Sequence, residues 1–171
     1  MNKKELKDVI QFVKETDKLK SVYRKCYLSQ EERFEDAAQH SWHMALFVML
    51  LKDHLPNELD YTKMLELAIT HDLVEIYAGD TYTFDEEANK SKVNREEESA
   101  KKLFVQLPEK LQSHFIELNN EYISRSSSEA KHISALNKLI PKLQNKITNY
   151  RAWKENNLSR EKLDESIEEC E

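Results

Sequence analysis

The chain has 171 residues, of which 39% are hydrophobic and 34% are charged, with one glycine and three prolines. This composition suits long amphipathic helices, and the length fits one domain spanning residues 1–171. The formal net charge of -6 excludes a general binder of nucleic acid polymers, which needs a basic surface. No segment has the continuous apolar length of a membrane span or a signal peptide, so we expect a cytoplasmic protein without membrane contact.

The first part of the chain is predicted to hold two helices separated by an irregular segment. Apolar residues at helical spacing predict a first helix that runs to about Lys20. A stretch of mixed charge over residues 22–39 leads into the next apolar run. There, an apolar stripe that begins at Trp42 predicts a helix over residues 41–55, which Pro56 ends.

The rest of the chain also shows helical periodicity. A helix is expected from about Tyr61 to Tyr77, because apolar residues repeat every three or four positions and Gly79 stands where a helix should stop. Residues 80–90 should form a loop. Further helices are expected over about residues 92–106, 107–123, 127–150, with a kink or short break at Pro141, and 151–170. The sequence therefore predicts an all-α domain of six or seven helices.

Ionisable residues interrupt the apolar face of the helix expected between Tyr61 and Tyr77. On a continuous helix Asp72 occupies a core position, with His71 beside it and Glu75 one turn further on. Burying an unpaired carboxylate is costly, so a divalent metal ion or an arginine should lie next to Asp72. The histidine and aspartate together offer a nitrogen and an oxygen ligand to a metal.

Two other segments place polar side chains toward an apolar core. His40 and His43 are three residues apart on one helix, so either could reach the same metal ion. Asn137 lies on the apolar face of its helix and needs a specific polar partner. The alternative is structural: a buried histidine or asparagine often only satisfies a core hydrogen bond, and Glu75 could be a solvated surface residue.

Four blocks of sequence resemble one known family. They read QHSWHMAL, THDLVEIYAGDTYTFD, NREEESAKKLF and SSEAKHISALNKLIPKLQN. Their order and content are similar to those of the HD-domain metal-dependent phosphohydrolases, in particular the branch that contains bacterial and eukaryotic 5′-deoxynucleotidases. The resemblance extends from about Leu19 to Asn157, and it implies the helical HD-domain bundle as the fold.

The resemblance also implies roles for individual residues. The family's metal ligands fall on His40, His71 and Asp72, and its fourth ligand, an aspartate, falls on Asn137. Its catalytic glutamate matches Glu75.

The substrate-side aspartate of the family matches Asp80. Gln39 replaces the glutamate that typically precedes the first histidine, and the family's substrate-binding Arg-Trp pair is not recognisable near the N-terminus. Arg24 and Arg33 are therefore our candidates for binding a phosphate, because a guanidinium group matches its geometry.

These residues predict a phosphomonoesterase that uses one divalent ion, of the Mn, Co, Zn, Ni or Mg class, and releases phosphate from nucleoside 5′-monophosphates, in particular deoxynucleotides. The resemblance implies a homodimer. Asn137 and Gln39 motivate an alternative, in which a catalytically weakened HD-domain protein binds a nucleotide or a small anion in a regulatory role.

Overall fold

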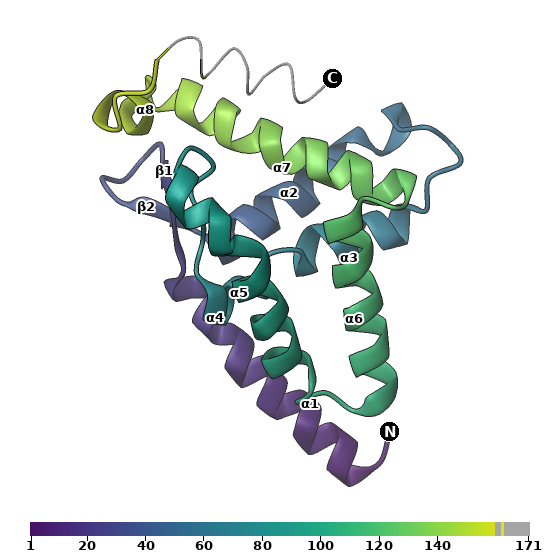
Figure 1. The fold of residues 1–171 in the computed structure, drawn as a ribbon. Helices are drawn as coiled ribbons and strands as arrows, with labels where there is room; N and C mark the ends of the chain where they lie inside the picture. Colours follow the sequence, from purple (N-terminus) through teal and green to yellow (C-terminus); the bar gives the residue numbers. More distant parts are fainter. Residues whose placement is uncertain (160–161, 163–171) are drawn as a thin grey trace.

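The computed structural model describes residues 1–159 and 162, and it is built mainly from helices (Figure 1). The helices of ten or more residues are α1 (Lys3–Thr16), α2 (Ala37–Leu51), α3 (Tyr61–Thr70), α5 (Glu86–Phe104), α6 (Glu109–Ser124) and α7 (Ser128–Ile147). Two short helices are α4 (Glu75–Ala78) and α8 (Arg151–Glu155). Within the described residues, no helix combines the length and the apolar character that crossing a bilayer requires. The predicted all-α fold is confirmed.

The segment predicted to be irregular contains a small antiparallel hairpin. Strand β1 (Tyr23–Tyr27) pairs with β2 (Phe34–Asp36), and a register irregularity interrupts the pairing. Alternation along β1 leaves Tyr23 and Lys25 exposed and turns Arg24 and Cys26 inward. Asp36 ends β2 and also caps α2, so the hairpin leads directly into the helix that carries His40.

The helix expected from Tyr61 to Tyr77 is interrupted, which corrects the sequence prediction. Helix α3 ends at Thr70, and α4 begins at Glu75. The Thr70 hydroxyl donates a hydrogen bond to the Glu66 carbonyl at 2.7 Å, a contact that competes with the helical ladder. Between the two helices the backbone forms tight turns, in which the Glu75 amide donates to the Asp72 carbonyl at 2.9 Å.

Other boundaries also differ from the prediction. Helix α1 ends at Thr16 and continues as a 3₁₀ turn over Asp17–Ser21, and α5 begins at Glu86, inside the expected loop. Helix α7 runs through Pro141, which lacks the N–H that would bond the Asn137 carbonyl. Beyond α8, the helix expected to continue to residue 170 falls largely outside the described residues.

Two apolar clusters meet at the interruption between α3 and α4. One joins α2, α3, α6 and α7 and includes Met64 and Leu67, whereas the other joins α1, α5 and their neighbours and includes Leu73 and Val74. Residues 71 and 72 lie where the chain passes from the first cluster to the second. The turn formed by these polar residues therefore lies inside the molecule, between two groups of packed helices.

Candidate metal centre

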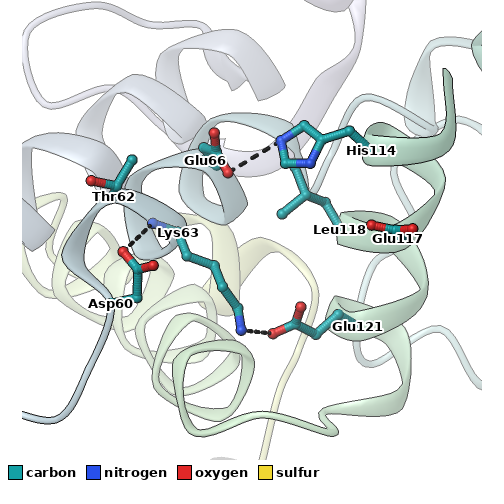
Figure 2. A pocket seen from close by; sticks show the side chains of 8 residues that line it. All are labelled: Asp60, Thr62, Lys63, Glu66, His114, Glu117, Leu118 and Glu121. Carbon is teal, nitrogen blue, oxygen red and sulfur yellow. Dashed lines mark hydrogen bonds and ion pairs between the residues drawn. The ribbon is translucent and has the colours of Figure 1, made fainter. Parts of the chain in front are cut away.

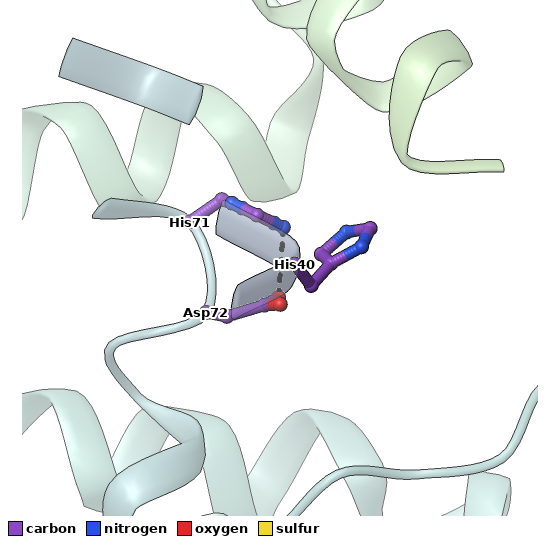
Figure 3. Close-up of side chains that lie close together, drawn as sticks. All are labelled: His40, His71 and Asp72. Atoms are coloured by element: carbon purple, nitrogen blue, oxygen red, sulfur yellow. Dashed lines mark ion pairs between the residues drawn. The ribbon is translucent and has the colours of Figure 1, made fainter. Parts of the chain in front are cut away.

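Three buried side chains converge at this turn (Figure 3). His40 comes from α2, and His71 and Asp72 come from the interruption after α3. Each offers one ligand atom, and these atoms lie within 4.8 Å of one another. Of the two histidines that the sequence offered on α2, the structure brings His40 into this cluster, whereas His43 is exposed and stacks on Trp42.

The interruption of the helix is what allows His71 and Asp72 to face each other. Adjacent residues on a regular α-helix point about 100° apart, so their side chains do not meet. In the turn, His71 Nε2 lies 3.0 Å from Asp72 Oδ1. The apolar repeat predicts one continuous helix through this pair, and the structure corrects that prediction: the two residues lie in a turn, with their side chains together.

The hydrogen bond at the far side of the His71 ring indicates its tautomer. Its Nδ1 lies 3.0 Å from the Ala68 carbonyl oxygen, which can only accept, so Nδ1 carries the proton. In a neutral ring the Nε2 lone pair then points at the Asp72 carboxylate. Two electron-rich atoms at that separation are stabilised by a proton or a metal cation between them.

His40 places a second imidazole nitrogen in this cluster, and the amide oxygen of Asn137 lies next to it. Its Nε2 lies 2.8 Å from Asn137 Oδ1, and the Asn137 amide donates through Nδ2 to the Tyr122 hydroxyl at 2.7 Å. Burial, together with the positive Arg24, lowers the pKa of His40 to about 3. The ring is therefore neutral near pH 7, which is the form that binds metals. Asn137 thus lies beside His40, and its role as the fourth ligand stays a prediction.

Arg24 approaches the cluster from strand β1. Its Nη1 lies 2.9 Å from Asp72 Oδ2 and 3.7 Å from Asp80 Oδ1, and its side chain is 12% exposed. Burial opposes the charge of Arg24, but Asp72 and Asp80 outweigh burial and raise its pKa. Burial likewise acts against ionised Asp72, whereas His71 and Arg24 hold its pKa below the usual range. The cluster thus contains a persistent cation and a carboxylate.

Glu75 and Asp80 lie next to this pair of charges. Glu75 begins α4 and is buried, and Asp80 follows Gly79, whose φ of 74° ends that helix. Burial is the main reason why the pKa of Glu75 lies well above its usual range, and the neighbouring Asp72 and Asp80 add to the shift. Burial also raises the pKa of Asp80, although Arg24 opposes it. The predicted catalytic glutamate and the predicted substrate-side aspartate therefore both border the centre.

Arg33, the other predicted phosphate-binding residue, lies elsewhere. Its side chain is 41% exposed and pairs with Glu31 at 2.6 Å, and its Nη1 donates to Gln39 Oε1 at 3.3 Å. Gln39 also accepts a hydrogen bond from the Asp36 backbone at 3.2 Å, as part of the capping box of α2. None of the contacts described for Arg33 reaches His40, His71 or Asp72.

A further buried carboxylate, that of Glu35, is not among the residues that the sequence patterns indicate. This strand residue is 3% exposed, and its Oε2 lies 3.7 Å from His40 Nδ1 and 3.9 Å from Arg24 Nε. Burial raises the pKa of Glu35 to about 7, against the opposing effect of Arg24. The signal available in the sequence was the capping box of Asp36 and Gln39, which fixes the start of α2 and puts Glu35 just before it.

The donor atoms of this cluster suit a divalent metal ion. Two imidazole nitrogens, one carboxylate oxygen and one amide oxygen lie together, a mixture that first-row divalent metals accept. Several buried polar atoms nearby make no hydrogen bond within the described part of the chain, among them His71 Nε2 and Glu75 Oε2. Buried polar atoms of this kind are typical of ion-binding sites.

A shallow pocket of about 280 Å³ lies between α3 and α6 and is separate from the metal centre (Figure 2). Ion pairs cross it, from Lys63 to Glu121 at 2.7 Å and from His114 to Glu66 at 3.3 Å. Its lining contains none of the residues predicted to bind metal or substrate. This pocket therefore lies apart from the candidate metal ligands.

Comparisons with known proteins agree with the geometry. The HD domain family matches residues 16–169. The 5′-deoxynucleotidase HDDC2 of Homo sapiens is 33% identical over 131 residues, which make up 76% of this chain and 63% of that protein, and the Bos taurus protein is also 33% identical. The matched part thus spans less than two thirds of these relatives.

A solved structure is similar over almost the whole chain. The crystal structure of a predicted metal-dependent phosphohydrolase from Magnetospirillum magnetotacticum MS-1 is 34% identical, with a TM-score of 0.90. The match covers 97% of this chain and 83% of that one. With its histidines and aspartate gathered at one buried turn, the chain belongs to the HD-domain family.

Proposed function

We propose that this protein is a metal-dependent phosphohydrolase that removes phosphate from nucleoside 5′-monophosphates, deoxynucleotides in particular. The observation that carries this proposal is the convergence of His40, His71 and Asp72 with a buried arginine beside them. A metal next to a guanidinium group provides two cationic partners for a phosphate. The similarity to curated 5′-deoxynucleotidases supports the same substrate class.

We propose that His40, His71, Asp72 and Asn137 hold one divalent ion. Such an ion would polarise a phosphoryl oxygen and lower the pKa of a water molecule, so that the water attacks phosphorus near neutral pH. The two imidazoles favour Mn²⁺, Co²⁺, Ni²⁺ or Zn²⁺ over Mg²⁺, which prefers oxygen ligands.

The residues around the ion would bind the substrate and move protons. Arg24, which now pairs with Asp72, would also donate hydrogen bonds to the phosphate, since the planar guanidinium group matches the spacing of phosphate oxygens. Glu75 would accept a proton from the attacking water and return one to the leaving 5′-oxygen, a task that suits a carboxyl group with a raised pKa. Asp80 would orient the substrate through a sugar hydroxyl. The contacts favour Arg24 over Arg33 as the phosphate-binding residue.

The test is phosphate release by the purified protein from a panel of ribonucleoside and deoxyribonucleoside 5′-monophosphates, with each divalent ion added in turn. We expect turnover that depends on the added metal and disappears with a chelator. Glu75→Gln should still bind metal but lower turnover by roughly a hundredfold or more, the size expected for a lost acid-base group.

The rival reading, a regulatory protein that binds nucleotides without hydrolysing them, rests on Asn137, because a neutral amide oxygen is a weaker ligand than a carboxylate. Folded, metal-saturated protein that releases no phosphate, while a nucleotide raises its melting temperature, would establish the regulatory role and overturn the enzymatic one.

We also propose that the protein forms a homodimer. Leu139, Leu143 and Ile147 follow one another at intervals of four along α7 and are 38%, 42% and 65% exposed, and Trp42 on α2 is 66% exposed. Apolar side chains at these positions suit a protein partner. Sedimentation equilibrium would distinguish a dimer from the 20.3 kDa monomer. The cytoplasmic location stays a prediction from the sequence.

A further inference from the structure

Glu35 connects the metal centre to the arginine beside it. Its Oε2 lies 3.7 Å from His40 Nδ1 and 3.9 Å from Arg24 Nε. All three atoms are buried, and none of them makes a hydrogen bond within the described residues. A carboxylate, an imidazole nitrogen and a guanidinium nitrogen thus face one another, each with unused hydrogen-bonding capacity.

The orientation of His40 gives this contact a specific meaning. The ring directs Nε2 toward the amide oxygen of Asn137, the candidate fourth ligand, and Nδ1 toward Glu35. An imidazole that binds a metal through Nε2 carries its proton on Nδ1, and that proton needs an acceptor. A closer approach of roughly 1 Å would convert the present separation into a hydrogen bond.

Arg24 meets Glu35 through a different nitrogen from the one that reaches Asp72. Its Nη1 contacts Asp72 at 2.9 Å, whereas Nε is the atom nearest Glu35. A carboxylate on the Nε side fixes the plane of the guanidinium group and leaves the terminal nitrogens to face the centre. Glu35 can therefore orient Arg24 without competing for the nitrogen that points at the site.

We propose that Glu35 is a positioning residue that accepts hydrogen bonds from His40 Nδ1 and Arg24 Nε, and so couples metal binding to phosphate binding. The link to His40 depends only on the metal centre, whereas the link to Arg24 rests on the proposed function. The side chain of Gln39, which directly precedes His40, is engaged in capping α2, and the carboxylate beside His40 Nδ1 is that of Glu35 on the strand.

Glu35→Gln tests the link to His40, because the amide keeps the shape of the side chain and removes its charge. We expect calorimetric titration with Mn²⁺ to show affinity lowered by roughly tenfold to a hundredfold, the usual effect of losing the outer partner of a histidine ligand. Glu35→Asp keeps the charge and should retain more affinity than Glu35→Gln. Glu32→Gln is the matched control, because it removes one charge from a nearby side chain that is 92% exposed.

The same variant tests the link to Arg24 when inorganic phosphate is titrated into Mn²⁺-saturated protein. Glu35→Gln should weaken phosphate binding even where the metal site is fully loaded, and Glu32→Gln should not. A carboxylate with only a structural role would lower the melting temperature and leave both affinities unchanged, provided the titrations are made well below melting. Unchanged Mn²⁺ affinity in folded Glu35→Gln would overturn the proposal.

A measurement on the unmodified chain covers the case in which Glu35→Gln does not fold. In Zn²⁺-loaded protein labelled with ¹⁵N at histidine, the proton of His40 should reside on Nδ1 and resonate far downfield because a carboxylate accepts it. A proton on Nε2 would refute the proposal. None of these experiments uses a nucleotide, so Zn²⁺-loaded protein with the expected Nδ1 proton but no phosphate release would contradict the proposed function and support the role of Glu35.

Discussion

Asn137 places an uncharged amide oxygen 2.8 Å from His40 Nε2. Asp72 is the one carboxylate among the candidate ligands, and it already pairs with Arg24. Asparagine and aspartate have nearly the same shape, so Asn137→Asp should preserve packing and add a negative charge. The Tyr122 hydroxyl, which now accepts from the amide, can turn and donate to the new carboxylate.

We expect Asn137→Asp to tighten divalent metal binding by roughly tenfold or more, about 1.4 kcal/mol, and to raise activity at low metal concentration. Without metal, the new carboxylate and Asp72 would repel each other, and one of them would hold a proton. Calorimetric metal titration measures the change, with the exposed Asn120→Asp as a control of equal charge. Equal affinities of Asn137→Asp and the unmodified protein would show that residue 137 is not a ligand.

The sequence located part of this centre and missed part of it, for identifiable reasons. The sequence indicates His71 and Asp72 because Asp72 interrupts the apolar face of a predicted helix, and the family resemblance separates His40 from His43. Glu35 was missed because it follows a run of charged residues, and a single buried glutamate among exposed ones has no periodic signature. Its role depends on a strand pairing that only the folded chain creates.

Among the contacts between helices, Glu129 connects the start of α7 to the start of α3. Its Oε1 accepts a hydrogen bond from the Asp60 backbone at 2.9 Å, and its Oε2 lies 3.4 Å from Lys63 Nζ. The bond from the Asp60 amide is the main reason why the pKa of Glu129 falls from 4.5 to about 2, and Lys63 contributes further. The ionised form is therefore bound more strongly in the folded protein than in the unfolded chain.

Glu129→Gln should lower the free energy of unfolding at pH 7 by about 1–2 kcal/mol, because the neutral amide oxygen would accept a weaker hydrogen bond than the charged carboxylate does. Because the folded pKa lies below the unfolded one, this contribution is complete above pH 4.5 and is lost as the pH falls toward 2. Urea unfolding at pH 7 and at pH 3.5 should show the difference between the two proteins shrinking, whereas exposed Glu117→Gln should show little difference at either pH. A difference that stays constant with pH would exclude this linkage.

The elements also show where sequence patterns fail. The apolar repeat from Tyr61 to Tyr77 is continuous, and neither glycine nor proline marks the interruption after Thr70. The turn forms because the side chain of Thr70 bonds the Glu66 carbonyl and because His71 and Asp72 find polar partners inside the molecule. Tertiary contacts of this kind lie outside any local pattern, whereas the long helices followed directly from their periodicity.

For the whole molecule, the candidate ligands connect segments far apart in the chain. His40 lies on α2, His71 and Asp72 lie between the two apolar clusters, and Asn137 lies on α7. An ion bound by all of them would therefore stabilise the folded protein against global unfolding as well as against local opening around the site. Binding that is specific to the folded state stabilises it by an amount set by the metal concentration relative to its dissociation constant.

Metal at a hundred times its dissociation constant should add about 2.7 kcal/mol of stability and raise the melting temperature by roughly 5–10 °C. Calorimetric melts of chelator-treated protein with and without added Mn²⁺ measure this shift. Asp72→Asn should melt at the same temperature in both conditions, because it lacks the charged ligand. Superimposable melts of the unmodified protein at saturating Mn²⁺ would mean that the ion does not bind the folded chain in preference to the unfolded one.

The hairpin that carries Arg24 contacts helices α7 and α8. Gln144 on α7 donates to the Tyr27 carbonyl at 2.8 Å, and the Tyr27 hydroxyl donates to Glu155 on α8 at 2.9 Å. The candidate metal ligands, by contrast, come from helices and from the turn between two of them. The hairpin is nevertheless joined to these ligands, because Glu35 of β2 lies 3.7 Å from His40 Nδ1 and Asp36 caps α2. A change in the length of the connection over residues 28–33 should therefore alter metal affinity and phosphate binding together, so that selectivity and reactivity evolve as one unit.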